Sequence, residues 1–351
     1  MVDPSVAELP AVPAPNVEAR REAVARHEAL AVPVGGLGAL AELGCWLAAA
    51  QGVCPPRAPG RPRAVVVAAD HGIAAAGVSA YPAGTTERQA AAARDRVLPA
   101  AVVADVAGAS VRVVDVGLDT PDPADERYRV RRGSGRIDHE DALTADETEA
   151  ALRIGRALAD EEVDAGADLL VPASLGVGAT TPASTIAAAV TGLEPVVVVG
   201  RGSGIDDDAW MRKAAAIRDA LRRTRSVRRD PVGLLRVAGG ADLAVLTGFL
   251  LQASLRRTPV LVDGLVVIAA ATLAEQLAPG ARQWWLAAQR SPEPAADALL
   301  ARLQLEPVLD LGVRVGDGTG ALALLPMLRM AARLLTDTAT AADSGIAPSR
   351  A

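Results

Sequence analysis

Five short apolar runs, rich in β-branched residues, set the fold that this chain can adopt. They are AVVVAAD (64–70), VRVVDVG (111–117), DLLVPAS (168–174), PVVVVGRG (195–202) and PVLVDG (259–264). A strand that lacks polar alternation is buried on both faces, as in a parallel sheet. Stretches with helical periodicity separate these runs, at 87–107, 142–165, 179–191, 208–224 and 238–254. The alternation predicts an α/β fold with a doubly wound, mostly parallel sheet.

Both ends of the chain differ from its middle, because they contain helical stretches without intervening strands. We expect these ends to pair into a small helical domain, residues 17–60 plus 293–345. The large α/β domain is expected over residues 61–292. The segments 1–16 and 346–351 are rich in small and polar residues and are predicted to be loose tails.

Composition excludes several classes of protein. The formal net charge of the 351 residues is −6 and 2% of them are aromatic, whereas a nucleic-acid-binding protein presents a basic face and stacking rings. No apolar run reaches the roughly 18 residues of a membrane-spanning helix. The N-terminal residues lack the basic and apolar regions of a signal peptide. Cys45 and Cys54 have neither redox nor zinc-site spacing. We therefore expect a cytoplasmic protein without nucleic-acid or membrane partners.

Three glycine-rich loops follow predicted strands or apolar segments. They are SLGVGATT (174–181), GRGSGIDDD (200–208) and VRVGDGTG (313–320), the last contributing to the same site as the others. Ligands bind beyond the carboxyl ends of parallel strands, so we expect the loops to converge at one edge of the sheet. A glycine loop that leads into a helix presents backbone N–H groups and the positive end of the helix dipole to an anion. The loops predict a phosphate site, although Thr180, Thr181 and Asp206 also fit as plain helix caps.

Lys213 is the single lysine among 36 basic residues. It lies in the helix predicted after the second glycine loop. A lysine is a compact point charge that suits a phosphate, and arginine stands at every other basic position. The alternative is chance survival on a solvated helix face. Neither Walker A nor full dinucleotide spacing is present, so the predicted ligand is smaller than a dinucleotide.

Asp317 lies among three glycines in the third loop, just before an apolar helical segment. Aspartate is a common N-cap, and that role alone would explain it. Glycines also let backbone approach a ligand closely and leave room for a carboxylate to act as a general base. The residues alone leave both roles open. His71 is expected to hold its loop together with Asp70. The histidines show no ligand spacing, so neither a metal nor a cofactor is expected.

Several longer strings resemble one family of enzymes, in the same order along the chain. They are GLGALAELGCWLAAAQG, AADHGIAAAGVSAYP, RRGSGRI, GRGSGIDD with Lys213, DPVGLLRVAGGADLA, TPVLVDG, RSPEP and RVGDGTGA. They make the chain similar to the nicotinate-nucleotide–dimethylbenzimidazole phosphoribosyltransferases, which assemble the lower ligand of cobalamin. The resemblance implies a Rossmann-like large domain, a small helical domain and a homodimer. It also implies transfer of phosphoribose from nicotinate mononucleotide to dimethylbenzimidazole or a related base, giving α-ribazole phosphate and nicotinate.

The resemblance also assigns site residues by position. Asp317 stands where the family has a glutamate that removes the proton from the attacking benzimidazole nitrogen. Ser79, Ala80 and Tyr81 stand where the family lines its benzimidazole pocket. The other positions implied for substrate binding are Arg88, Ser174, Gly176, Gly178, Gly202, Ser203, Gly204, Lys213, Ser291, Val315 and Gly316.

Several positions around the expected pocket depart from the family pattern. Arg88 replaces a glutamine, Ser174 an acid, Ala179 an asparagine and Gln289 a histidine, and Asp317 is one methylene shorter than glutamate. In addition, Pro99 is expected to kink the helix predicted over 87–107. The donor glycines and Lys213 persist while the acceptor side differs. The alternative function is therefore a catalytically weak paralogue that binds nucleotide or an active partner subunit.

Overall fold

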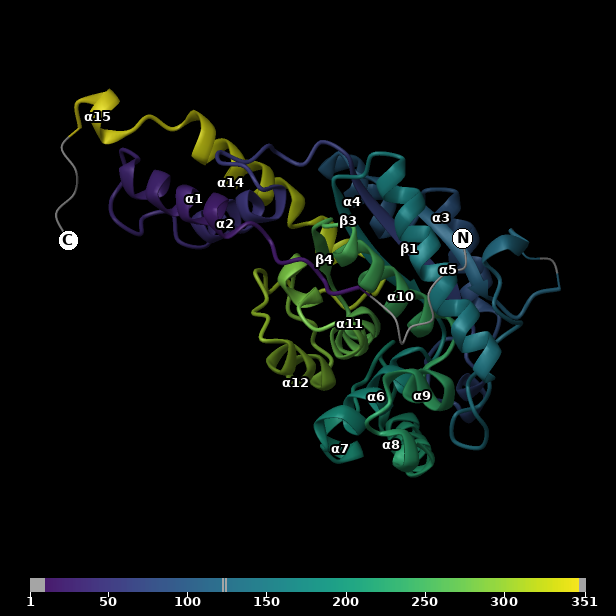
Figure 1. Ribbon diagram of the computed structural model, residues 1–351. Helices are drawn as coiled ribbons and strands as arrows, with labels where there is room; N and C mark the ends of the chain where they lie inside the picture. The colour runs from purple at the N-terminus through teal and green to yellow at the C-terminus, as the bar shows by residue number, and fades with distance from the viewer. Residues whose placement is uncertain (1–9, 122, 124, 347–351) are drawn as a thin grey trace.

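The computed structural model describes residues 10–121, 123 and 125–346. Its centre is a five-stranded parallel sheet with the order β2-β1-β3-β4-β5 (Figure 1). The strands are β1 (Pro62–Ala69), β2 (Ser110–Gly117), β3 (Leu169–Leu175), β4 (Val260–Val262) and β5 (Trp285–Ala287). The chain runs from β1 outward to β2 and then returns past β1 to β3. The predicted doubly wound α/β sheet is therefore confirmed.

Helices cover both faces of the sheet, because successive side chains of a strand point to opposite faces. Val65 and Val67 of β1 belong to the core formed with α5 (Ala145–Asp164) and α10 (Ala241–Leu255). Val66 belongs to a separate cluster with α3 (Thr85–Arg94). Each of these valines is at most 1% exposed. Burial on both faces explains why the strand lacks polar alternation.

One predicted strand is wrong, and one observed strand is absent from the prediction. Residues 195–202 begin with the short helix α7 (Pro195–Val198) instead of a strand. Pro195 has no N–H to donate to a sheet, and its fixed φ suits the first turn of a helix. Val196 and Val197 are 57% and 50% exposed, unlike residues of a central strand. The unpredicted strand is β5, which is too short for an argument from periodicity.

The helix predicted over 87–107 is two helices, α3 and α4 (Pro99–Ala107). Arg96, which lies between them, has a φ of 62°, a left-handed conformation that a helix cannot continue through. Pro99 then occupies the first turn of α4, where a missing N–H leaves no hydrogen bond unmade. Pro99 therefore begins a helix and does not kink one, which corrects the expectation.

The other predicted helices are confirmed as α5, α6 (Thr180–Thr191), α8 (Asp207–Arg223) and α10. Asp206 is the N-cap of α8, since its carboxylate accepts the N–H of Ala209 at 2.8 Å. The remaining helices near the sheet, with short single turns labelled η, are η2 (Gly72–Ala76), η3 (Glu126–Tyr128), η4 (Thr224–Val227), α9 (Pro231–Leu234), η5 (Leu235–Gly239), α11 (Leu265–Leu277), η6 (Ala281–Trp284) and α13 (Thr319–Leu322).

Helices from the two ends of the chain lie side by side (Figure 1). α1 (Val17–Ala29) and α2 (Ala39–Gln51) pack with α14 (Leu325–Asp337), and the short α15 (Ala341–Ser344) follows. α12 (Pro294–Leu303) packs instead on α6 and α11, beside the sheet. The division into a helical and an α/β domain stays a prediction. Of the expected loose tails, the outermost residues, 1–9 and 347–351, lie outside the described residues.

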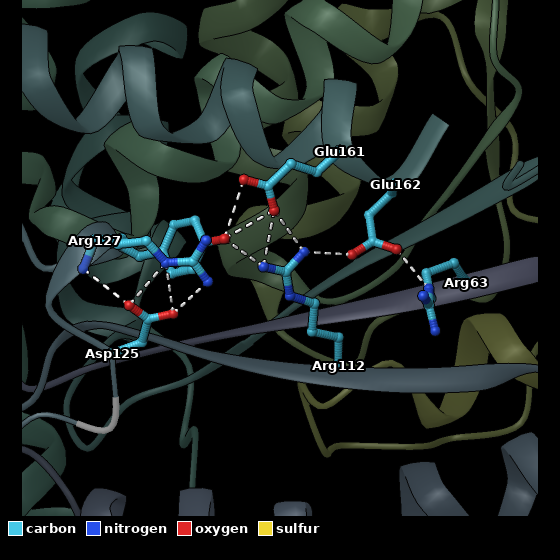
Figure 2. Close-up of polar contacts among 7 residues, drawn as sticks. Arg63, Arg112, Asp125, Arg127, Glu161 and Glu162 are labelled. Atoms are coloured by element: carbon cyan, nitrogen blue, oxygen red, sulfur yellow. Dashed lines mark hydrogen bonds and ion pairs between the residues drawn. The ribbon is translucent and has the colours of Figure 1, made fainter. Parts of the chain in front are cut away.

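An ion-pair network joins α5 to the amino ends of β1 and β2 (Figure 2). Glu162, whose side chain is 2% exposed, accepts hydrogen bonds from Arg63 and, at 2.7 Å, from Arg112. Glu161 accepts from Arg112 and from the hydroxyl of Tyr128 at 2.8 Å. Burial acts to lower the pKa of Arg112, but its hydrogen bonds to Glu162 and Glu161 raise that pKa overall. The network therefore fixes the amino end of the sheet and the charged loop that contains Tyr128.

Candidate functional site

A cavity of about 530 Å³ lies at the carboxyl ends of the strands. It lies where the chain order reverses, between β1 and β3, which is the position at which open α/β sheets bind ligands. Its wall contains most of the residues that the sequence singles out, namely Ser79, Tyr81, Ser174, Gly176, Gly178, Gly202, Ser203, Gly204, Ser291, Val315, Gly316 and Asp317. The three glycine loops thus converge on one edge of the sheet.

Ala80 contributes to the site without lining the cavity. Its N–H donates to Ser203 Oγ at 2.9 Å, and the hydroxyl of Ser79 lies 3.1 Å from the same oxygen. Ser203 belongs to the second glycine loop, whereas Ser79 and Ala80 follow the first strand. These hydrogen bonds therefore join the expected acceptor segment to the expected phosphate loop.

The structure does not bring Arg88 into the cavity. The side chain of Arg88 is exposed on α3, and the neighbouring Gln89 lines the cavity instead. Gln89 shares a helix face with Thr86, three residues earlier, whose buried hydroxyl accepts the N–H of Val177 at 3.0 Å. The cavity wall therefore contains the amide of Gln89 and not the guanidinium of Arg88. The helical repeat places Gln89 on the same face as the inward-facing Thr86, and this repeat was the sequence signal that could have identified Gln89 as a cavity residue.

Lys213 lies behind the second glycine loop and is fully buried. Its Nζ donates to Thr180 Oγ1 at 2.8 Å and to the carbonyl oxygen of Gly200 at 3.1 Å. Burial lowers the pKa of Lys213 to about 8, and the carboxylate of Glu293 acts in the opposite direction. The solvated-face alternative is excluded, because a lysine is fully buried only where partners stabilise its charge.

The glycines of the second loop leave room for this lysine. Gly202 and Gly204 have φ values of 48° and 94°, which favour glycine. A Cβ on Gly202 would lie 3.0 Å from Thr180 Oγ1 and 3.3 Å from Lys213 Nζ. A side chain at that position would therefore press on the buried cation. Lys213 places a positive charge directly behind the backbone of this loop, an arrangement that suits a phosphate.

The third loop holds Asp317 against the edge of the sheet, where the N–H of Ser174 donates to the carbonyl of Gly316 at 2.9 Å. Asp317 is 3% exposed. Its Oδ1 accepts the N–H and the hydroxyl of Thr319, at 3.1 and 2.7 Å. Its Oδ2 accepts the N–H of Ala100 at 3.1 Å, in the first turn of α4. Asp317 therefore caps a helix far away in the sequence while it also lines the cavity.

Asp263, which the sequence reading did not single out, is a second buried carboxylate in the same wall. Its Oδ1 accepts from Gln289 Nε2 at 3.0 Å and its Oδ2 from the N–H of Ala321 at 3.1 Å. Burial raises the pKa of Asp263 to about 6, with a further raising influence from Asp317, while the hydrogen bonds lower it. An acid directly after a buried parallel strand was the available signal.

A buried polar chain lies behind the cavity wall. The hydroxyl of Ser174 donates to Asp242 Oδ2 at 3.1 Å, and His71 Nε2 lies 3.2 Å from the same oxygen. Burial acts to lower the pKa of His71, but the charge and hydrogen bond of Asp242 raise it overall. His71 thus holds its loop, as expected, but its partner is Asp242 and not Asp70. Ser174, which stands where an acid was expected, is in contact with a carboxylate from α10.

The described ranges contain neither a metal-binding cluster nor a membrane-spanning helix. No cluster of three or more His, Cys, Asp or Glu side chains in these ranges has the arrangement of a metal site. No helix in them is both long and apolar enough to span a membrane. A second hollow is lined by Arg228, Arg229 and Arg302 and lies at the carboxyl ends of α6, α11 and α12. Arginine is favourable beside helix carboxyl ends, which explains this cluster without a ligand.

Glycine loops around a buried lysine, with three buried carboxylates (Asp263, Glu293 and Asp317) in one cavity at the switch point of the sheet, define an enzyme that handles a small phosphorylated molecule. A family model described as phosphoribosyltransferase matches residues 12–346, and the chain belongs to this family.

Named relatives match over nearly the whole chain. The chain is 54% identical, over 342 residues, to a nicotinate-nucleotide–dimethylbenzimidazole phosphoribosyltransferase of Mycobacterium avium strain 104, covering 97% of this chain and 98% of that one. It is 52% identical, over 338 residues, to the enzyme of the same name from Mycobacterium tuberculosis, covering 95% and 93%. The crystal structure of the enzyme from Thermus thermophilus has a TM-score of 0.89 at 35% identity, covering 95% of this chain and all of that one. The Rossmann-like fold implied by the sequence is therefore confirmed.

Proposed function

We propose that this chain transfers the 5-phosphoribosyl group of nicotinate mononucleotide to dimethylbenzimidazole or a related base, in cobalamin biosynthesis. The products are α-ribazole phosphate and nicotinate. The relatives that carry this name are more than half identical to the chain over nearly its full length, so the alternative of an inactive paralogue is not favoured. The observation that carries the proposal is the cavity that joins a glycine loop backed by Lys213 to the Asp317 carboxylate.

The donor is anchored by its 5′-phosphate. Backbone N–H groups of the first two glycine loops and the hydroxyls of Ser203 and Ser291 surround this end of the cavity. Lys213 supplies positive charge from behind the loop. Fixing the phosphate holds the anomeric carbon of the ribose in place for attack, which removes much of the entropy barrier of a two-substrate reaction. The glycines Gly176, Gly178, Gly202 and Gly204 keep side chains out of this space.

The acceptor base occupies the part of the cavity lined by Ser79, Tyr81, Val315 and Gly316. The ring nitrogen that gives up its proton attacks the anomeric carbon, and the bond to the nicotinate nitrogen breaks with its electron pair remaining on the pyridine ring. The N–H proton of the acceptor passes to Asp317, which acts as general base. Gln89 takes the place expected for Arg88 beside the acceptor.

We further propose that the protein is a homodimer in the cytoplasm and that Asp317 works without a metal or a cofactor. These points rest on the family resemblance. Light scattering after size-exclusion chromatography should give twice the mass of the 351-residue chain. A monomer mass would overturn the dimer without affecting the proposed reaction.

The proposed reaction is tested by incubating the protein with nicotinate mononucleotide and a panel of benzimidazoles, phenols and purines, followed by mass spectrometry. Asp317→Asn should lower turnover at least about 10²-fold, the contribution of a general base. Its amide would keep an oxygen for only one of the Thr319 and Ala100 N–H groups and present a donor to the other, so the free energy of unfolding should fall by about 1–3 kcal/mol.

Asp310→Asn is the matched control, because Asp310 is exposed in the same segment of the chain. It should leave both turnover and stability unchanged. If Asp317→Asn keeps the parent rate, the general base is another group. If the parent forms no product with any base, the chain is a binding paralogue.

A further inference from the structure

Glu293 is a buried carboxylate that the reaction described above does not use. It lies between β5 and α12, lines the cavity and is 8% exposed. Its Oε1 accepts the N–H of Gly202 at 2.8 Å. Its Oε2 is buried and has no hydrogen-bond partner among the described residues. Burying such an oxygen is unfavourable unless another interaction offsets it.

Glu293 and Lys213 hold the same short stretch of the glycine loop from two sides. A Cβ on Gly200 would lie 2.0 Å from Glu293 Oε2, so this position accepts only glycine. The carboxylate binds the N–H of Gly202, while the ammonium binds the carbonyl of Gly200. Glu293 therefore hydrogen-bonds Gly202 and lies against Gly200. Lys213 hydrogen-bonds Gly200 and lies against Gly202.

The two groups also carry opposite charges in a buried part of the protein. Burial lowers the pKa of Lys213, and Glu293 is the charged residue that acts to raise it. The other charged residues of this loop and of the start of α8, Arg201, Asp206 and Asp207, are exposed to solvent. Thr180, the contact from α6, is uncharged. Glu293 is thus the buried charge that faces Lys213.

We propose that Glu293 is a positioning residue of the donor site, which fixes the Gly200–Gly202 segment and supplies the buried negative charge that keeps Lys213 protonated. The inference rests on the proposed function, in which this loop and this lysine bind the donor phosphate. Without Glu293, the lysine would lose its proton at a lower pH, and the loop would lose the acceptor for the Gly202 N–H.

The single lysine of the sequence allows a direct test that needs no substrate. Protein grown with lysine labelled with ¹³C at Cε gives one lysine resonance, which belongs to Lys213. In the parent this resonance should titrate near pH 8. In Glu293→Gln the midpoint should move down by about one pH unit, the effect of losing a nearby opposite charge. Asp208→Asn, which removes an exposed carboxylate from α8, should leave the midpoint in place. Equal midpoints in the parent and Glu293→Gln would overturn the proposal.

Calorimetric titration with nicotinate mononucleotide separates the charge of Glu293 from its hydrogen bond. Glu293→Gln keeps an oxygen for the Gly202 N–H, so its donor affinity should match the parent at pH 6 and be roughly fivefold weaker at pH 8. Glu293→Ala loses both interactions and should bind the donor more weakly at both pH values. An equal loss in Glu293→Gln at both pH values would indicate a purely structural role and contradict the proposal. A parent that binds no donor would defeat the proposed function, whereas the lysine titration would still decide the role of Glu293.

Discussion

Lys213 is a charged residue that the fold buries completely, and at the residue scale its charge is the first feature to test. Lys213→Met should weaken the binding of nicotinate mononucleotide by about 1.5–3 kcal/mol, the usual contribution of a charge-assisted hydrogen bond. Isothermal titration calorimetry measures this directly. Arg218→Met is the control, because it removes a positive charge from an exposed position on the same helix. An unchanged affinity in Lys213→Met would show that the lysine does not contact the phosphate.

The phase of α3 leads to a second prediction at this scale. Gln89→Ala should change the relative use of benzimidazoles, because Gln89 lines the cavity. Arg88→Gln should leave the acceptor profile unchanged, because Arg88 is exposed and does not line the cavity. Competition assays with paired acceptors, analysed by mass spectrometry, give both results. The assignment is wrong if Arg88→Gln shifts the profile and Gln89→Ala does not.

The sequence predicts the location of some site residues better than that of others. Lys213 and Asp317 stand out by rarity and by their glycine surroundings, and both lie at the cavity or behind its wall. The partner of Asp317, Ala100, and the partner of His71, Asp242, lie far away in the sequence. Such pairs depend on the packing of whole elements. Arg88 illustrates a finer limit, since an error of one residue on a helix moves a side chain by about 100° around its axis.

At the scale of elements, the network on α5 holds the amino ends of β1 and β2. Glu162→Gln should lower the free energy of unfolding by about 2–3 kcal/mol, because it leaves the partly buried Arg63 without its charged partner and Arg112 with Glu161 alone. Urea denaturation measures the change. Turnover should be unaffected, since the network lies at the opposite end of the strands from the cavity.

Glu18→Gln is the matched control for this prediction. Glu18 also pairs with an arginine, Arg21, but both side chains are exposed, so the free energy of unfolding should change far less than in Glu162→Gln. Equal effects of the two substitutions would show that burial of Glu162 adds nothing to stability.

Helices and central strands can be predicted from sequence patterns. α8 shows a helical repeat, and β1 is an apolar run without polar alternation. Short elements escape this argument. The valines of 195–202 favour a strand by composition, yet Pro195 starts a helix on the surface. β5 has three residues, and its place in the sheet depends on its pairing with β4. Composition predicts the secondary structure that a segment prefers, whereas contacts with neighbouring elements decide which structure a short segment adopts.

At the scale of the whole molecule, Asp263 gives the free energy of unfolding a dependence on pH. The pKa of its carboxyl is raised in the folded protein from 3.8 to about 6. The folded state therefore binds this proton more tightly than the unfolded state, so stability is present below pH 3.8 and is lost as pH rises through 6. The loss should amount to about 3 kcal/mol.

Asp263→Asn cannot titrate and serves as the reference for this dependence. Chemical denaturation of both proteins between pH 4 and pH 7 should give curves that diverge, with the parent losing stability relative to the variant. The nearby carboxylate of Asp317 contributes to the raised pKa and is present in both proteins. Parallel curves would contradict a raised pKa for Asp263.

The overall architecture was open to prediction because a doubly wound sheet follows from the order of strands and helices alone. The packing of the two chain ends against each other is a matter of tertiary contacts. α12 demonstrates this, because it belongs to the C-terminal helical stretch by sequence and packs on α6 and α11 in space. Only the long, strongly periodic segments carry enough information to fix their neighbours.

The hydrogen bond from Ala100 to Asp317 has a consequence for the order in which parts of the protein form during translation. It joins residues 217 positions apart, and all five strands precede Asp317 in the chain. A ribosome releases the amino end first, so the sheet can assemble before the loop that carries Asp317 has been made. Until that loop emerges, the first turn of α4 has no carboxylate cap. The nascent chain can therefore form its sheet before the proposed general base, Asp317, has been made.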